Sequence, residues 1–505
     1  MPIKPDLKPV KFINDPVYGG IPVTELELKI IETPIFQRLR GLRQLAKVNY
    51  VFPGAEHSRF VHSLGVLYIM GLMTDHLLKQ GQIAEIDAIK MRVAALVHDI
   101  GHYPLSHLGE AVYGYCKDNQ TASTLLQNPV SENDSTSKLY QIASSHSKSA
   151  HHEQLGKFIV MHNTQLRDIL EEYDIDPEEI GNIFTGEIGS RNMVYSQLLH
   201  SSLDADRLDY LLRDSYQTGV KYGLVDLQYL IRLLMVVDNP KSEESLSTDE
   251  STDEGSFKEN ELCKKVLVCN KKGQHVIEHF LMSRYFHYSQ VVFHKTNAAF
   301  EGMIKGLYVK LLQNGAFMYN TLEDIHEGVN SDEFMNFNDS ALETAFYNYY
   351  KSSKCDEEYK RLYEMYRDRI RPKVIFEMKD LYDENPSSDF ATLKWQLKKN
   401  PEKITEKIGT DRWGYQIIPI TLEKIHGHYS ISEAIQNHEE ELREAVKVYD
   451  PDTKRISYLA EDKLSVINKL ANYKSEFIRI YVLEEKESTY DYFDMHRKIN
   501  ELIKS

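Results

Sequence analysis

The chain has 505 residues, of which 42% are hydrophobic and 27% are charged, as in an ordinary globular protein of two or three domain-sized units or one large helical body. Its formal net charge of -16 argues against non-specific binding of long nucleic acids, because a polyanion is repelled. Four scattered cysteines without a Cys-x-x-Cys pair argue against a disulfide framework. With no signal peptide and no long uncharged apolar run, we expect a cytoplasmic protein outside the membrane.

The N-terminal segment predicts a short strand and turn over residues 11–20, followed by a helix over 25–31. A proline at residue 34 breaks that helix and starts a second one over 35–45. Three arginines lie off the apolar face of the second helix, and periodicity leaves two interpretations open. They form either a solvated face or a phosphate-binding surface, since guanidinium groups match phosphate oxygens. These arginines are Arg38, Arg40 and Arg43.

A loop over residues 51–59 leads into a helix that begins near Phe60 and carries His62 in its first turn. A lone histidine there is more often structural than a ligand. Arg59 lies close enough along the helix to share its face. The next helix is apolar and ends on the pair His98 and Asp99. Burying an imidazole and a carboxylate together is unfavourable unless something compensates, and a divalent cation would do so.

Two later segments are polar. Residues 117–150 predict a long loop or partly ordered insertion, and the acidic run 241–256 predicts a tether. Between them, a helix over 195–216 places Asp206, Tyr210 and Asp214 on one face at a spacing of four. The two carboxylates repel each other. This repulsion would be relieved if a metal bound one carboxylate and a hydroxyl-bearing ligand bound the other. The alternative is a solvated face paired with neighbouring arginines. Further along, we expect a helix over 274–312 and strands at 266–268, 416–420 and 477–482.

His62, the His98-Asp99 pair and Asp206 follow the H…HD…D order of the HD-domain metal phosphohydrolases, and the chain resembles that superfamily. Additional stretches resemble one branch, the deoxynucleoside triphosphate triphosphohydrolases, which includes the sterile-alpha-motif/HD-domain dNTPase and its bacterial relatives. The resemblance covers about residues 8–310. The stretches are Phe36–Arg40, Gln44-Leu45, Val51–Ala55, Arg59-Phe60, His62–Val66 and Asp204-x-Asp206.

The resemblance implies a mainly α fold, with an HD-domain helical core, a few short strands and a helical C-terminal region. We expect an HD catalytic core over residues 1–240 and an acidic linker or loop over 241–260. Helices over 261–320 would complete the active site, and a C-terminal helical region with short strands would occupy 321–505.

The resemblance also implies roles for individual residues. The implied cofactor is one divalent metal, Mn, Fe, Zn, Ni or Mg, with Mg also accompanying the nucleotide. The implied metal ligands are His62, His98, Asp99 and Asp206. The implied substrate-binding residues are Gln44, Arg59, His102, Arg207, Tyr210, Asp214 and Tyr288. The implied catalytic residues are His152, Glu110 and His107.

Some positions depart from the family pattern. Glu110 stands where the family has an aspartate that partners the catalytic histidine, and Tyr103 stands where the animal enzyme has glycine. The family's regulatory nucleotide pocket implies a dNTP or GTP effector and a homotetramer or dimer of dimers. The matching residues are Lys11, Glu32, Gln37 and Arg40. Glu32 replaces an aspartate that recognises guanine, which leaves the identity of the effector open.

The activity implied by the resemblance is hydrolysis of dNTPs to deoxynucleoside and inorganic triphosphate, with activation by a nucleotide. Metal, arginine and histidine donors suit this reaction because they stabilise charge on phosphate oxygens. One alternative is an HD phosphodiesterase or nuclease acting on another nucleotide. A second alternative is a non-catalytic nucleotide-sensing scaffold, against which the full set of metal ligands argues.

Overall fold

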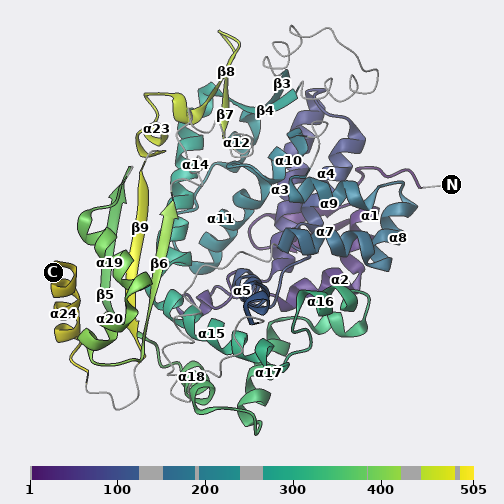
Figure 1. Cartoon of the computed structure of the whole chain (residues 1–505). Helices are drawn as coiled ribbons and strands as arrows, with labels where there is room; N and C mark the ends of the chain where they lie inside the picture. The colour runs from purple at the N-terminus through teal and green to yellow at the C-terminus, as the bar shows by residue number, and fades with distance from the viewer. Residues whose placement is uncertain are drawn as a thin grey trace, which may run out of the picture.

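The computed structural model describes residues 3–123, 152–187, 193–238, 265–383, 385–421, 445–471, 473–483 and 490–504. Most of the expected insertion at 117–150 and the whole acidic run 241–256 lie outside these residues. The fold is mainly α, as predicted, with a helical body and small sheets at its periphery (Figure 1).

The N-terminal half of the chain forms a bundle around helix α3, whose side chains Val66, Leu67 and Ile69 are fully buried. By length and composition alone this helix could cross a membrane, but 67% of its apolar window is buried among its neighbours. It therefore acts as the core helix of the bundle. The helices are α1 (Glu25–Glu32), α2 (Pro34–Gln37), α3 (Arg59–Lys79), α4 (Glu85–Val97), α5 (His107–Ser123), α7 (His152–His162), α8 (Thr164–Glu172), α9 (Pro177–Thr185), α10 (Met193–Leu199), α11 (Ala205–Thr218) and α12 (Leu227–Leu233).

The helix expected over 274–312 is interrupted. A π-helical turn over Tyr288–Val292 ends its first part, and the His294 side chain then accepts a hydrogen bond from the Thr296 amide and caps a new helix. The remaining helices are α14 (Gln274–His287), α15 (Lys295–Gln313), α16 (Leu322–Gly328), α17 (Asp339–Lys351), α18 (Glu357–Arg367), α19 (Ser388–Lys399), α20 (Pro401–Ile408), α23 (Val466–Ala471) and α24 (Tyr492–Lys504).

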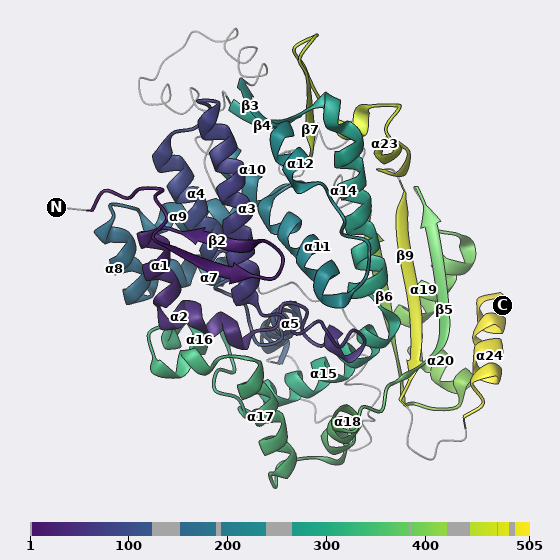
Figure 2. The same cartoon turned by 180° about the vertical axis from the view of Figure 1, so that it is seen from behind.

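Within the described residues, three sheets flank the helical body. A hairpin of β1 (Lys11–Asp15) and β2 (Gly19–Val23) lies across the N-terminal helices (Figure 2). A four-stranded sheet has the order β3-β4-β7-β8, with only the β4–β7 pair parallel. An antiparallel three-stranded sheet has the order β5-β9-β6. The strands are β3 (Leu234–Asp238), β4 (Lys265–Asn270), β5 (Lys373–Tyr382), β6 (Trp413–Thr421), β7 (Lys447–Asp450), β8 (Arg455–Tyr458) and β9 (Lys474–Val482).

The three-stranded sheet has a hydrophobic core of its own. Its outer face packs against α19, α20 and α24 through residues such as Trp413, Ile478 and Ile499. Its inner face meets α15 through a smaller cluster that includes Ala298 and Phe477. The main core fills the rest of the helical body and extends from the N-terminal helices through α15, α17 and α18.

The helix expected over 35–45 ends much earlier. Helix α2 stops at Gln37, a 3₁₀ turn follows over Arg38–Gly41, and the backbone is extended at Leu42. The backbone N–H of Gln44 then donates to the carbonyl of His57, and the backbone N–H of Arg59 donates to the carbonyl of Leu42. This backbone pairing with a segment 13 to 17 residues away replaces the helix and holds Gln44 beside the start of α3.

Candidate active site

Three helices bring the four predicted metal ligands together. His62 lies in the first turn of α3, His98 and Asp99 follow the last turn of α4, and Asp206 lies in the first turn of α11. The Asp206 Oδ1 atom is 3.0 Å from His62 Nε2 and 3.7 Å from His98 Nε2. Asp99 is 3.5 Å from His62 Nε2 through Oδ2 and 3.4 Å from His98 Nε2 through Oδ1.

Each of the two histidines is oriented by a hydrogen bond at its other nitrogen. His62 Nδ1 donates to Asp209 Oδ2 at 2.7 Å, and His98 Nδ1 donates to the Ala95 carbonyl at 2.8 Å. Both Nε2 atoms are buried and have no hydrogen-bond partner, although carboxylate oxygens lie nearby. Histidines that bind a metal through one ring nitrogen usually donate a hydrogen bond from the other nitrogen, and that bond fixes the orientation of the ring. His62 and His98 have this arrangement. The two imidazoles and Asp206 offer ligand atoms within 4.8 Å of one another, and Asp99 adds a carboxylate 3.4 to 3.5 Å from the two Nε2 atoms. Nitrogen and carboxylate oxygen donors suit a divalent transition ion, so the residues present fit the cofactor.

The site is rich in negative charge. Burial alone would lower the pKa of His62, but the carboxylates of Asp206 and Asp209 outweigh it and raise that pKa to about 10. Burial would likewise raise the pKa of Asp206, yet the neighbouring histidines hold it well below its usual value. The cluster therefore favours a positive charge at its centre. A bound cation would replace a proton in that role.

A second group of titratable side chains comes from the turn after α4, the first turn of α5 and the start of α7. Glu110 Oε2 accepts hydrogen bonds from His152 Nδ1 at 3.2 Å and from His107 Nδ1 at 3.0 Å. The His152 ring stacks on His102 at 3.7 Å between centroids. Burial, followed by the charges of Arg59 and His152, keeps the pKa of His102 well below its usual value. The pKa of His152 is raised because Glu153 and Glu110 outweigh the effect of burial.

Asp99 and Arg59 connect the two groups. Asp99 Oδ1 lies 3.1 Å from His102 Nε2, and Asp99 Oδ2 accepts a 2.6 Å hydrogen bond from Arg59 Nη1. Arg59 also donates through Nε to the Ser106 hydroxyl at 2.9 Å and is almost fully buried. The metal ligands and the histidine group therefore form one continuous polar cluster.

A third set of polar side chains borders α11. Asp214 accepts a 2.8 Å hydrogen bond from His57 Nε2 at one oxygen and from His287 Nε2 at the other. Burial would raise the pKa of Asp214, but these two bonds hold it well below its usual value. Nearby, the side-chain oxygen of Gln44 is buried without a hydrogen-bond partner. A buried amide oxygen of this kind needs a donor from a ligand or from water.

Tyr210 lies one turn from Asp206 and Asp214 on α11. Its ring is 5.3 Å from His287, and burial raises its pKa well above the usual value, with a smaller upward contribution from Tyr288 that Arg284 opposes. Arg207 is tied to the Ser201 carbonyl at 2.6 Å and to Asp204, the residue that caps α11. Of the seven predicted substrate-binding residues, Arg59 and His102 contact Asp99, and Arg207, Tyr210 and Asp214 lie on the helix that carries Asp206.

The four residues predicted for a regulatory nucleotide lie elsewhere, at the surface. Gln37 Oε1 accepts a 2.7 Å hydrogen bond from Arg40 Nε, and the Arg40 guanidinium stacks over the Phe60 ring. Lys11 on β1 and Glu32 at the end of α1 are exposed.

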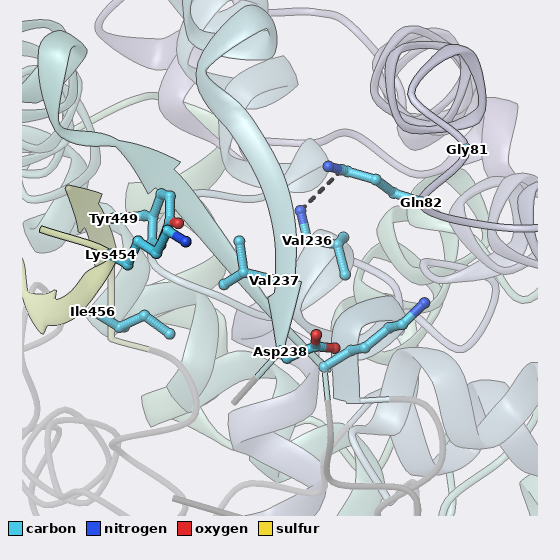
Figure 3. A pocket seen from close by; sticks show the side chains of 9 residues that line it. Gly81, Gln82, Val236, Val237, Asp238, Tyr449, Lys454 and Ile456 are labelled. Carbon is cyan, nitrogen blue, oxygen red and sulfur yellow. Dashed lines mark hydrogen bonds between the residues drawn. The ribbon is translucent and has the colours of Figure 1, made fainter. Parts of the chain in front are cut away.

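A separate open cavity of about 500 Å³ lies at the edge of the four-stranded sheet (Figure 3). It is lined by Val236, Asp238 and Tyr449 among others, and the Gln82 side chain accepts a hydrogen bond from the Val236 amide beside it. None of the predicted site residues lines this cavity.

Sequence reasoning missed several residues that hold the site. His57, Asp209, Arg284 and His287 are buried beside predicted residues, and each of them contacts one or lies within its electrostatic reach. Two signals were available in the sequence. His57 lies two positions before Arg59, and Arg284 and His287 share one face of α14 at a spacing of three.

The region that carries these residues is similar to known proteins. The HD domain family matches residues 59–214, which include all four predicted metal ligands. An uncharacterized protein of Bacillus subtilis is 29% identical over 294 residues, covering 58% of this chain and 53% of that protein. Human deoxynucleoside triphosphate triphosphohydrolase SAMHD1 is 29% identical over 259 residues, covering 46% of this chain and 37% of the human protein. The chain spans about half or less of the length of these two curated relatives.

Among solved structures, a phosphohydrolase of Bacteroides thetaiotaomicron superposes with a TM-score of 0.58 at 23% identity, covering 93% of this chain and 99% of that one. At that identity the likeness concerns the fold alone. The chain thus contains an HD domain, and its homologues include the SAMHD1 deoxynucleoside triphosphate triphosphohydrolases.

Proposed function

We propose that the protein is a metal-dependent dNTP triphosphohydrolase, which releases a deoxynucleoside and inorganic triphosphate. The observation that carries the proposal is the pair of buried Nε2 atoms of His62 and His98, which have no hydrogen-bond partner and lie close to the Asp206 carboxylate. Arg59, which binds Asp99, and Gln44 belong to the same site. The similarity to SAMHD1 supports the choice of substrate.

The metal would be held by His62, His98, Asp99 and Asp206, and when bound it supplies positive charge that stabilises the phosphate oxygens. The arginines and histidines of this chain add to that stabilisation. Arg59 contributes a buried positive charge beside Asp99. His102 is neutral because its pKa is lowered, so it donates a hydrogen bond to a phosphate oxygen without adding charge.

The Glu110–His152 pair supplies the proton-handling group. Because the pKa of His152 is raised by Glu110 and Glu153, its imidazole holds a proton to a higher pH than a free histidine does. It therefore suits the donation of a proton to the leaving sugar oxygen. His107 shares the same Glu110 oxygen and has a side chain that is 70% exposed, so it faces the side from which a triphosphate arrives.

Recognition of the sugar is assigned to Gln44, Tyr210 and Asp214, with Tyr288 nearby. The unpartnered Gln44 oxygen requires a donor, and a sugar hydroxyl provides one. Such a site discriminates against an analogue that lacks the hydroxyl, because the amide oxygen would then stay buried and unpaired.

We further propose nucleotide activation through Lys11, Glu32, Gln37 and Arg40 and assembly into a homotetramer in the cytoplasm. The exposure of Lys11, Glu32 and Arg40 supports a surface that a second nucleotide reaches.

The test is an incubation of the purified protein with each dNTP and Mn²⁺ or Mg²⁺, with and without GTP or dGTP, followed by chromatography of nucleosides and phosphates. The proposal predicts equal amounts of deoxynucleoside and inorganic triphosphate, with less product from the matching 2′,3′-dideoxynucleotide, which lacks the sugar hydroxyl. Release of pyrophosphate or orthophosphate, or no deoxynucleoside under any condition, contradicts it. His98→Ala serves as the inactive control.

A further inference from the structure

The turn that carries the phosphate-side histidines has an unfavourable backbone. Leu105 and Ser106, both non-glycine residues, adopt left-handed conformations with φ of 62° and 56°. The left-handed conformation is unfavourable for a residue with a Cβ atom, so the surrounding structure must hold both residues in place. This turn separates His102 from His107 and thereby sets their positions relative to each other.

A carboxylate from outside the HD domain match holds the turn. Asp339, the first residue of α17, accepts a 2.7 Å hydrogen bond from the Leu105 amide at Oδ1 and a 3.0 Å bond from the Arg43 amide at Oδ2. Asp339 is 2% exposed. One side chain thus ties the strained turn to the extended segment that carries Gln44.

Ser106 completes the connection to the metal ligands. Its hydroxyl donates to the Arg43 carbonyl at 2.7 Å and accepts from Arg59 Nε at 2.9 Å. Arg59 in turn binds Asp99 at 2.6 Å. A continuous series of hydrogen bonds therefore runs from Asp339 through the turn to a predicted metal ligand.

The packing around this series leaves little room for adjustment. Arg38 is buried and donates to the carbonyls of Ile100, His102 and Phe337. It has no carboxylate bond of its own among the described contacts, and burial lowers its pKa to about 9. A Cβ atom on Gly41 would lie only 2.8 Å from the Asn338 Cβ. The start of α17 is therefore pressed directly against the segment before Gln44.

We propose that Asp339 is a positioning residue for the HD-site reaction. It holds the Leu105–Ser106 turn in its strained form and so fixes His102 and His107 relative to Asp99. The proposal rests on the proposed function only for the identity of the substrate. According to this proposal, the start of α17 contributes to the active site, although it lies far along the chain from the HD domain match.

Asp339→Ala and Asp339→Asn test the proposal, with the exposed Asp332→Asn as the matched control. Alanine removes both acceptors, whereas asparagine retains one carbonyl oxygen. We expect kcat to fall by roughly 10²-fold for alanine, because a displacement of about 1 Å is sufficient, and by less for asparagine. Metal content and KM should stay near those of the parent protein, and Asp332→Asn should match it throughout. A parent-like kcat in Asp339→Ala, or an activity loss fully explained by lost metal, overturns the proposal.

Two readouts separate this test from that of the proposed function. Rates are measured on dNTPs and on bis(p-nitrophenyl) phosphate, a generic phosphodiester. If the parent hydrolyses only the generic ester, the dNTPase assignment fails while the ranking of the variants still tests Asp339. A crystal structure of Asp339→Asn provides a readout without turnover. We expect Leu105 or Ser106 to leave the left-handed region, and an unchanged turn contradicts the proposal.

Discussion

The polar cluster of the HD domain and the three-stranded sheet near the C-terminus both bury charged side chains, but they do so in opposite ways. In the sheet, Glu476 accepts from Lys394 at 2.8 and 2.9 Å and from the Tyr382 hydroxyl at 2.7 Å. Among the described residues of β5, β6 and β9 and of the helices α19, α20 and α24 on the outer face of the sheet, no buried side-chain nitrogen or oxygen lacks a partner. In the HD cluster, ring nitrogens of His62, His98 and His102 are buried without one.

This contrast separates a structural ion pair from a binding site. A buried polar group without a partner is unfavourable, so several such groups gathered in one place require an explanation. We infer that the unpartnered ring nitrogens of the HD cluster bind a ligand. The predictions below test that distinction, starting with the largest expected effect.

Replacing a metal ligand should have the largest effect on activity. We expect His98→Ala to lose its metal and to reduce hydrolysis by about 10³-fold or more, since a bound ion contributes several kcal/mol to charge stabilisation. Elemental analysis and the product assay measure both quantities. Retention of a full equivalent of metal together with full activity would show that His98 is not a ligand.

Asp209→Asn should have the next largest effect. Asp209 orients His62 through a 2.7 Å hydrogen bond, and loss of such a partner lowers metal affinity or activity by roughly 10–100-fold. Asp209 also binds Arg213, so Asp15→Asn is the matched control, because Asp15 binds the same arginine without contacting His62. Equal metal affinities in the two variants would assign Asp209 a purely structural role.

In the sheet, removing a partner should affect stability alone. Lys394→Met leaves Glu476 with only the Tyr382 hydroxyl, and we expect the free energy of unfolding to fall by about 1–3 kcal/mol. Hydrolysis per folded molecule and metal content should not change. Chemical denaturation and the product assay together check this, and a selective loss of activity would erase the contrast between the two regions.

The smallest effect concerns pH. The His57 and His287 bonds depress the pKa of Asp214, so this carboxylate contributes stability that is fully present above its unfolded pKa of about 3.9. That contribution is lost as the pH falls from there toward the lower folded value. Asp214→Asn should therefore flatten the dependence of unfolding free energy on pH below about pH 4. An unchanged pH profile in acid denaturation would contradict the assigned pairing.

The sequence was sufficient where local patterns coincide with the tertiary structure. The positions of His62, Asp206 and Asp214 on their helices follow from helical spacing, and the strands at 266–268, 416–420 and 477–482 lie within β4, β6 and β9. The predicted domain boundaries and the roles of the individual site residues stay predictions.

The sequence failed where long-range contacts override local preference. Backbone pairing with His57 and Arg59 replaces the helix expected through residue 45. Strand β5 escaped notice because a bulge between Val374 and Phe376 interrupts its alternation. Asp339 is separated from Leu105 by 234 positions, so no local pattern connects them.

The most direct test of the central claim is a crystal structure of the purified protein, with anomalous scattering data collected on both sides of the Fe, Mn, Ni and Zn absorption edges. The account predicts one ion bound by His62, His98, Asp99 and Asp206, with the Nε2 atoms of both histidines as ligands. A metal-loaded, dNTP-hydrolysing protein whose ion lies elsewhere, with these four side chains turned away from it, would contradict the account.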